Sequence, residues 1–311
     1  METLAPPWDP VKLDQLFGSL GSQLISGAFI LLVCFAPLFV LMVIVHFRRK
    51  RFKADYLEPF TEMPLRPPGE SLRLKIESLG DELESSLFGL MATSFFAFVI
   101  ILYLFAKLTG VLWTAALGTL AISYAIYAPK LLRQLKQLWD HRLGLKGECA
   151  VGQELNQLVA DGFQVFHDLP FENFNIDHVL VGPAGVWAVE TKTRRKPAAI
   201  KGAAKALVTY DGQTLQFPWG HDRFGLDQAE RNAATLSKWL TASTGDFTPV
   251  TAMLVLPGWW VERKARGTVN VLNPKEVRRA FPPRPANPLS PDRIQRIAFQ
   301  ITERCRMERP Q

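Results

Sequence analysis

The chain has few cysteines and lacks the short motifs that mark several large enzyme classes. Its 311 residues include three cysteines, which are scattered and form no CxxC pair. This argues against a disulfide-bonded secreted scaffold and against a cysteine zinc site. No GxxxxGK[ST] loop and no GxSxG turn occur, so a nucleotide-driven motor and a serine nucleophile elbow are not indicated. The five histidines are dispersed and form no ligand pattern.

Long uncharged apolar runs are confined to the first 130 residues. The segments 25–45, 87–106 and 111–128 contain no charged residue, and runs of this length can cross the ~30 Å hydrocarbon layer. We predict a transmembrane helix over 25–45 and a transmembrane helical hairpin over 87–128. The alternatives are a cleaved signal peptide and a buried soluble hairpin. An acidic start and the basic cluster 48–51 favour a retained anchor. Transport has no support, because no run carries a central charge.

Lysine and arginine are distributed unevenly around these runs. The segment 46–86 carries eight of them and the segment 129–146 carries five, whereas residues 1–24 carry one. The positive-inside rule therefore places the short N-terminal segment 1–24 outside a bacterial-type inner membrane and everything after residue 129 in the cytoplasm. The cytoplasmic loop 46–86 contains helically spaced apolar residues from Ser71 onward, which predicts an amphipathic helix. The net charge of +7 is compatible with nucleic acid, anionic lipid or membrane topology.

The residues after 129 predict a mixed α/β domain. A linker helix is expected over 129–146, and Gly147 with Glu148 is expected to open a second helix that ends near Gly162. Short strands follow, including a hairpin of 206–210 with 214–217, then a helix over 226–240, a buried strand over 250–256, and another strand over 269–272. We expect the domain to span 147–281 and a C-terminal loop and helix to occupy 282–311. This order of helix, strands, helix and strand is typical of a mixed α/β domain.

The central feature of this domain is the stretch NIDHVLVGPAGVWAVETK at 175–192. Two β-branched runs flank Gly182 and Gly185, which predicts a β-hairpin. If the loop is symmetric, Asp177 lies opposite Glu190, with Cβ atoms about 4.5–5.5 Å apart on one face. Lys192 shares that face. A one-residue slip would separate the three side chains.

Two carboxylates this close repel each other unless a cation or a shared proton lies between them. Oxygen ligands favour Mg²⁺ or Mn²⁺, and a neighbouring lysine stabilises charge that develops on a phosphate. This combination suits phosphodiester hydrolysis. The alternative is a hairpin with a solvated polar end and a surface ion pair.

Other charged residues adjoin this hairpin in the sequence. Glu148 is either a third carboxylate or a favourable charge at a helix N-terminus. Arg194, Arg195 and Lys196 form a basic edge that suits a phosphate backbone or, alternatively, a membrane surface. His178 points to the opposite strand face, which favours a packing role over that of a catalytic base.

The chain resembles the nuclease-related domain over about 143–260. The resemblance rests on Gly147 and Glu148, on the apolar helix to Leu158, on the string 175–192, and on the helix that carries Gln228. That domain is assigned to the PD-(D/E)xK nuclease superfamily, so the resemblance implies a restriction-endonuclease-like fold.

The resemblance also implies roles for individual residues. Asp177 matches the metal-binding aspartate, and Glu190 with Lys192 matches the (D/E)xK element. Glu148 matches the glutamate of the first helix, and Gln228 matches the glutamine of the later helix. The asparagine-proline that often precedes this glutamine is absent, which puts the role of Gln228 in doubt. The implied metal ligands are Asp177, Glu190 and Glu148.

The functional expectation is a membrane-anchored, cytoplasmic, metal-dependent nuclease that acts on DNA in preference to RNA. The alternative is a membrane-anchored scaffold that binds nucleic acid or a protein partner without cleavage. The sequence is compatible with a homo-oligomer, and it does not distinguish endonuclease from exonuclease activity.

Overall fold

The structure is a computed structural model that describes residues 40–41, 43–44, 47–48, 64–105, 110–196, 206–281 and 285–306. It divides into two compact units. The first comprises Met1–Pro59 and Leu79–Lys136, and the second comprises Phe60–Ser78 and Gln137–Gln311. The predicted first membrane span, 25–45, lies almost wholly outside the described residues, as do the loop residues 49–63.

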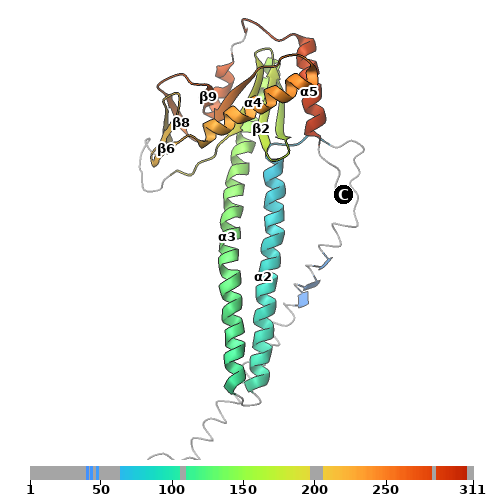
Figure 1. Cartoon of the computed structure of the whole chain (residues 1–311), viewed down its shortest axis with the longest axis vertical. Helices are drawn as coiled ribbons and strands as arrows, with labels where there is room; N and C mark the ends of the chain where they lie inside the picture. The colour runs from blue at the N-terminus through green and yellow to red at the C-terminus, as the bar shows by residue number, and fades with distance from the viewer. Residues whose placement is uncertain are drawn as a thin grey trace, which may run out of the picture. The chain divides into compact units, whose positions relative to one another are not determined.

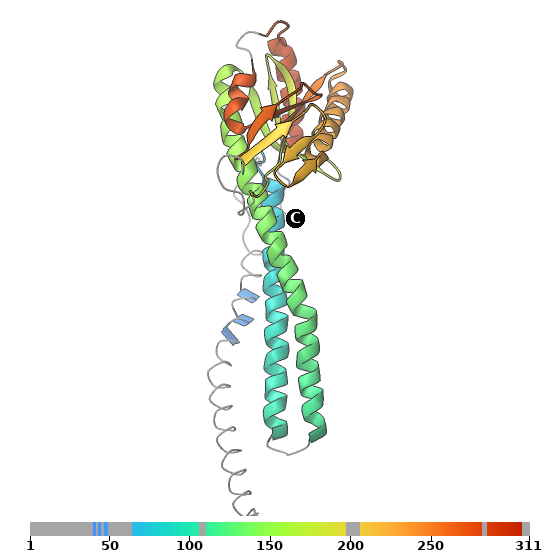
Figure 2. The ribbon, with the colours of Figure 1, turned by 90° about the vertical axis from the view of Figure 1, so that its left-hand side faces the viewer.

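The described part of the first unit consists of two long helices. They belong to α2, Glu70–Phe105, and α3, Gly110–Asn156, which run side by side within this unit (Figures 1 and 2). Gln134 on α3 donates a hydrogen bond to Glu82 on α2 at 3.4 Å. Among the described residues, one helical segment, Glu70–Ile100, is long and apolar enough to cross a membrane. The three predicted spans are not confirmed by this finding.

Both helices extend further than the sequence predicts. The amphipathic helix expected in 46–86 is continuous with the next apolar run, and α2 starts at Glu70. The predicted second helix start at Gly147 is wrong, because α3 runs without a break through Pro129 and Gly147. One internal glycine costs a helix only about 1 kcal/mol, which packing readily offsets. Glu148 therefore lies within α3 rather than at a helix N-terminus.

The second unit is the predicted mixed α/β domain. Its main sheet has the strand order β1-β2-β3-β7-β9. Strands β1 to β3 are antiparallel, whereas β7 and β9 run parallel to β3. The strands are β1 (Gln164–Pro170), β2 (Asn175–Gly182), β3 (Gly185–Thr191), β7 (Val250–Val255) and β9 (Val269–Leu272).

A smaller sheet has the order β6-β5-β4-β8, and only its β4–β8 pair is parallel. Its strands are β4 (Leu207–Tyr210), β5 (Leu215–Phe217), β6 (Gly220–Asp222) and β8 (Trp260–Arg263). The expected β4–β5 hairpin is thus confirmed. The remaining helices are η1 (Gln157–Asp161), α4 (Phe224–Thr244), η3 (Pro274–Ala280) and α5 (Pro291–Cys305).

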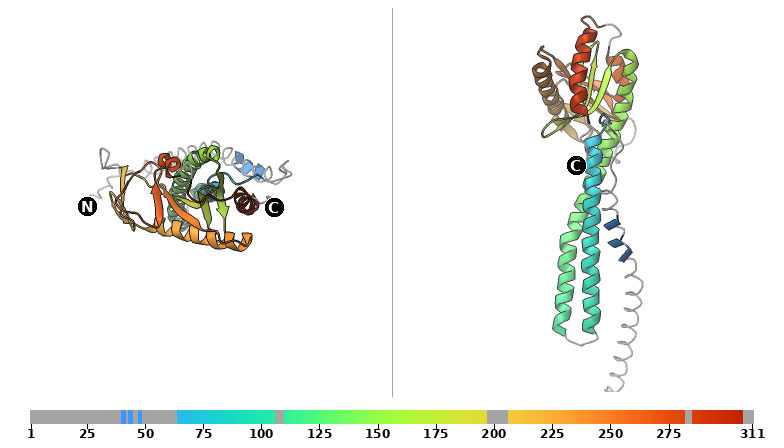
Figure 3. Two further views of the ribbon diagram at one scale, coloured as in Figure 1. Left: turned by 90° about the horizontal axis from the view of Figure 1, so that it is seen from above. Right: turned by 90° about the vertical axis from the view of Figure 1, so that its right-hand side faces the viewer.

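Helices cover both faces of the main sheet (Figure 3). On one face, α4 and α5 bury residues such as Leu236 and Ile301 against Val179 and Ala188. On the other face, α3 buries Val151 and Leu155 against Leu180 and Val189, and η1 and η3 extend this layer. The C-terminal helix α5 is therefore part of the core of the domain. The alternation of side chains along β2 and β3 decides which residues reach each layer.

Candidate active site

The β2–β3 hairpin has the register that the sequence predicts. Gly182 pairs with Gly185, and His178 pairs with Val189, so the next position outward sets Asp177 opposite Glu190. Asp177 Oδ2 accepts a hydrogen bond from the Thr191 backbone N–H at 2.7 Å. This bond fixes the Asp177 side chain across the open end of the hairpin.

Glu190 is the most enclosed carboxylate of the group. Its side chain is 1% exposed. Oε1 lies 2.7 Å from Lys192 Nζ, and Oε2 accepts a hydrogen bond from Asn232 Nδ2 at 2.8 Å. Lys192 follows the end of β3, and its backbone N–H donates to the Val255 carbonyl at 3.0 Å, which keeps it beside β7. The ammonium and the amide together satisfy a carboxylate that would otherwise be costly to bury.

Glu148 reaches the same region from α3. It is buried, and its Oε2 has no hydrogen-bond partner. Burial, together with the charges of Asp168 and Glu190, raises its pKa to about 8. Burial is the largest cause that raises the pKa of Asp177 well above its ordinary value, and the negative charges of Glu190 and Glu148 add to it. Burial raises the pKa of Glu190 too, against the opposing effect of Lys192. The three predicted carboxylates therefore interact electrostatically in one place.

The close approach of α3 to this place requires a glycine. A Cβ added at Gly147 would lie 1.7 Å from Thr193 Oγ1, far inside van der Waals contact. We expect Gly147→Ala to displace α3 from the residues after β3 and to lower the free energy of unfolding by about 1–3 kcal/mol. Urea denaturation of the full chain measures this.

Gly118→Ala is the control for that substitution. Gly118 lies in the same helix and has open space around it, so alanine there should leave stability unchanged or raise it by up to about 1 kcal/mol. Equal effects of the two substitutions would contradict the close approach of α3.

The raised pKa of Glu148 predicts how stability depends on pH. Between the ordinary pKa of 4.5 and the folded-state value of about 8, the folded protein holds a proton that the unfolded chain has lost. The contribution of Glu148 to the free energy of unfolding is therefore fully present below pH 4.5 and is lost as the pH rises through about 8. In EDTA, Glu148→Gln should be close to wild type near pH 5 and clearly more stable near pH 9. Thermal unfolding at both pH values measures this. A difference in stability between the variant and the wild type that shrinks as the pH rises would contradict the prediction.

The helix α4 supplies two amides to Glu190. Gln228 forms a side-chain hydrogen bond that lowers the pKa of Glu190, so the structure brings this predicted residue to the site, while its role remains a prediction. Asn232 follows one turn later, and sequence reasoning missed it. It is a buried polar residue between Ala229 and Leu236 on the apolar stripe of α4. A polar residue on a core-facing stripe is the signal that could have identified it.

The predicted basic edge is largely engaged in ion pairs. Arg194 lies 2.6 Å from Asp222, and Arg195 lies 2.8 Å from Asp140. Lys196 is exposed. His178 is fully buried on the opposite face of β2, and its Nδ1 lies 2.9 Å from Nδ1 of His167. Burial lowers the pKa of His178 well below its ordinary value, so the ring is neutral and packs in the α3-facing layer.

A further buried carboxylate, Asp168, was not predicted. It accepts hydrogen bonds from Arg66 Nε at 2.7 Å, Ser71 N at 3.0 Å, Ser71 Oγ at 2.6 Å and Asn175 Nδ2 at 3.1 Å. Asp168 thereby holds the start of α2 against β1 within the second unit, and it lies close enough to raise the pKa of Glu148.

The donor set suits a hard cation, since it consists of carboxylate oxygens and includes the unpartnered Oε2 of Glu148. In this arrangement, however, the described residues contain no group of three or more His, Cys, Asp or Glu side chains placed to hold a metal ion. Both oxygens of Glu190 are engaged by Lys192 and Asn232. Two open grooves, of 840 and 770 Å³, lie around the loop 264–267 and contain none of the predicted site residues.

Of three comparisons with known proteins, one found a match. No curated protein and no solved structure matches the chain. Residues 143–257 match the family model of the nuclease-related domain. The predicted resemblance is thus confirmed for the part of the chain that carries the three carboxylates, Lys192 and Gln228.

Proposed function

We propose that the chain is a metal-dependent nuclease that hydrolyses phosphodiester bonds of nucleic acid, with DNA favoured over RNA. One observation carries the proposal. Glu190 raises the pKa values of both Asp177 and Glu148 in the part of the chain that matches the nuclease-related domain, and the Lys192 ammonium lies 2.7 Å from Glu190. Carboxylates with raised pKa values next to a fixed cation are candidates for a site that handles phosphate charge.

Each residue has a distinct role in this proposal. Asp177, Glu190 and Glu148 would hold Mg²⁺ or Mn²⁺, which when bound lowers the pKa of a coordinated water and so supplies the nucleophile. Lys192 neutralises the charge that develops on the phosphate. Thr191 orients Asp177 through its backbone N–H, and Asn232 and Gln228 orient Glu190. The raised pKa of Glu148 means that divalent-cation binding should release protons and tighten as pH rises toward about 8.

We also propose that this activity is anchored at a cytoplasmic membrane. The apolar segment Glu70–Ile100 supports an anchor, and the lysine and arginine distribution supports a cytoplasmic domain. The orientation is tested by adding protease to inverted and right-side-out vesicles. Cleavage within the α/β domain in inverted vesicles alone is the expected result.

A second candidate is a scaffold that binds nucleic acid without cutting it until a partner assembles the site. One observation favours it: both oxygens of Glu190 are already held by Lys192 and Asn232. An ion that uses Glu190 must displace or share one of these contacts.

The deciding experiment compares the full chain with its Asp177→Asn variant. Asparagine keeps the size of the side chain and removes its charge. Labelled DNA and RNA, single- and double-stranded, are incubated with Mg²⁺, with Mn²⁺ or with EDTA. We expect cleavage that needs the metal and falls by at least about 10²-fold in the variant. Metal-independent cleavage, or equal rates for both proteins, would reject the nuclease; binding without cleavage would favour the scaffold.

A further inference from the structure

Two exposed aromatic rings lie near the segment that follows β3, one beside Lys192 and the other connected to Arg194 through Trp259. Phe224, the first residue of α4, is 58% exposed, and Trp219, in the β5–β6 turn, is 51% exposed. Lys192 Nζ lies 5.3 Å from the centre of the Phe224 ring, and the same atom contacts Glu190. An exposed ring that stands beside Lys192 is a candidate contact for a ligand of the proposed site.

Trp219 is held in a fixed orientation. Its ring stacks on Phe217 with centroids 4.8 Å apart and planes within 9°. It also meets the edge of the fully buried Trp259 at 5.4 Å. Trp259 Nε1 in turn donates a hydrogen bond to the Arg194 carbonyl at 3.2 Å. The exposed Trp219 ring is thereby tied to the basic segment that follows β3.

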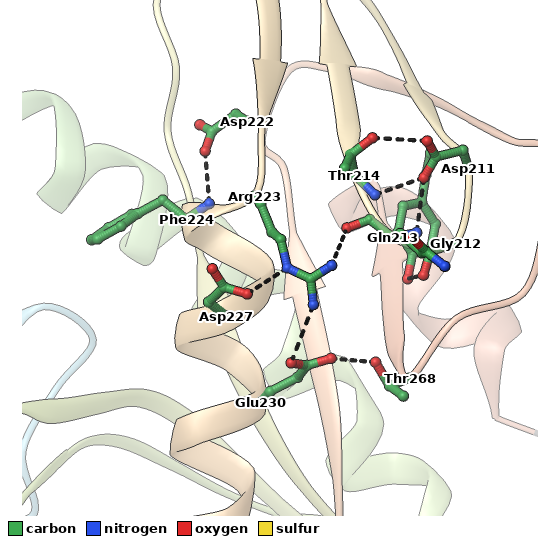
Figure 4. Close-up of polar contacts among 11 residues, drawn as sticks. Asp211, Gly212, Gln213, Thr214, Asp222, Arg223, Phe224, Asp227, Glu230 and Thr268 are labelled. Carbon is green, nitrogen blue, oxygen red and sulfur yellow. Dashed lines mark hydrogen bonds and ion pairs between the residues drawn. The ribbon is translucent and has the colours of Figure 1, made fainter.

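Phe224 is tied to the same basic segment by a different route. Asp222 accepts a hydrogen bond from the Phe224 backbone N–H at 2.8 Å, and it also holds Arg194 at 2.6 Å. Arg223 anchors this end of α4 by contacts to Asp227 and the Gln213 carbonyl, and the Phe224 side chain points away from that network (Figure 4). Both rings are thus presented to solvent on a rigid base.

We propose that Trp219 and Phe224 stack against bases of a single-stranded nucleic acid whose phosphates lie along Lys192 and Lys196. This rests on the proposed nuclease function and specifies its substrate: a single strand or an unpaired region. Aromatic rings combined with a basic track bind unpaired bases, because every base has a stacking face. In a duplex these faces are covered by neighbouring base pairs, so the two rings cannot use them. The positive side chains beside the two rings complement the negative charge of phosphates, so they favour a nucleic acid over a neutral ligand.

The test measures binding by the full chain in EDTA, where metal-dependent cleavage is absent. A labelled mixed-sequence oligonucleotide is used as a single strand and as a blunt duplex. We expect Trp219→Ala and Phe224→Ala each to weaken single-strand binding about tenfold and duplex binding less than about twofold. Trp219→Phe and Phe224→Tyr keep a ring and should retain most of the affinity. Phe299→Ala, which removes a ring that is 61% exposed on α5, should change neither.

The outcomes separate this inference from the proposed function. Equal losses on both nucleic acids, or no loss, would overturn the stacking role even if the wild type cleaves. Absence of cleavage in Mg²⁺ and Mn²⁺, with selective single-strand binding intact, would reject the nuclease and keep the stacking role. Besides the single strand and the duplex, the same variants are tested for binding to vesicles of anionic lipid. If the two alanine variants lose vesicle binding and keep single-strand binding, the rings contact a membrane and the inference is wrong.

Discussion

Replacing Lys192 with methionine is expected to slow phosphodiester cleavage by about 10²- to 10³-fold. Methionine keeps an unbranched stem, which matters because a Cβ at Gly225 would lie only 3.1 Å from Lys192 Cγ and the space is tight. The ammonium is lost, and with it the 2.7 Å contact to Glu190 Oε1. Lys192 is also the largest influence that lowers the pKa of Glu190, so its removal should leave Glu190 protonated over a wider pH range.

Single-turnover rates across a pH series measure this effect. The lysine should matter to the chemical step, so the rate should fall even at saturating enzyme, where weaker binding no longer limits it. Arg296→Met is the control, because it removes a cation on α5, outside the predicted basic edge, from an exposed ion pair with Asp246. Exposed pairs contribute little, so its cleavage rate should stay within about threefold of wild type. A Lys192→Met protein within that same range would remove the lysine from the mechanism.

Replacing Asp168 with alanine is expected to lower the free energy of unfolding by about 3–5 kcal/mol. Its carboxylate is 1% exposed and accepts from Arg66, Ser71 and Asn175. Removal would leave the half-buried Arg66 guanidinium without its partner, and it would leave the first turn of α2 without an acceptor for the Ser71 backbone N–H. A protein with typical stability of about 5–15 kcal/mol would be close to unfolding.

Denaturant unfolding of the full chain measures this loss, and two variants sharpen it. Asp168→Asn keeps a side chain that tolerates the positive φ of 50° at this position, so it isolates the charge and should cost less than alanine. Asp161→Ala removes an exposed pair with Arg278 and should cost no more than about 1 kcal/mol. Equal costs for Asp168→Ala and Asp161→Ala would contradict the proposed role of Asp168.

This role of Asp168 has a practical consequence for expression of the domain. A fragment that begins at residue 130 lacks both Arg66 and Ser71, although it contains every residue that matches the nuclease-related domain. Residues 60–78 belong to the same compact unit as residues 137–311. Experiments on the site should therefore use the full chain.

Local patterns in the sequence were sufficient to predict the register of the central hairpin. Gly182 and Gly185 bracket a two-residue turn, and that turn determines which residues of β2 and β3 face each other. The opposition of Asp177 and Glu190 follows from that count. The amphipathic stripe of α4 and the β4–β5 hairpin were predictable for the same reason, since helical and strand periodicities are short-range properties. The uncharged apolar runs before residue 130 can likewise be identified from the sequence alone.

Contacts between distant segments could not be predicted in this way. The start of α2 meets Asp168 about one hundred residues later, and Asn232 meets Glu190 across forty-two positions. The close approach of α3 to the residues after β3 depends on Gly147 fitting against Thr193, which no periodicity encodes. In the first two cases the deciding quantity is the cost of burying a polar or charged group, and that cost is known only when packing has brought its partners together. The sequence thus determined the hairpin and the charged residues at its open end, whereas the tertiary structure decided which groups neutralise, orient and enclose them.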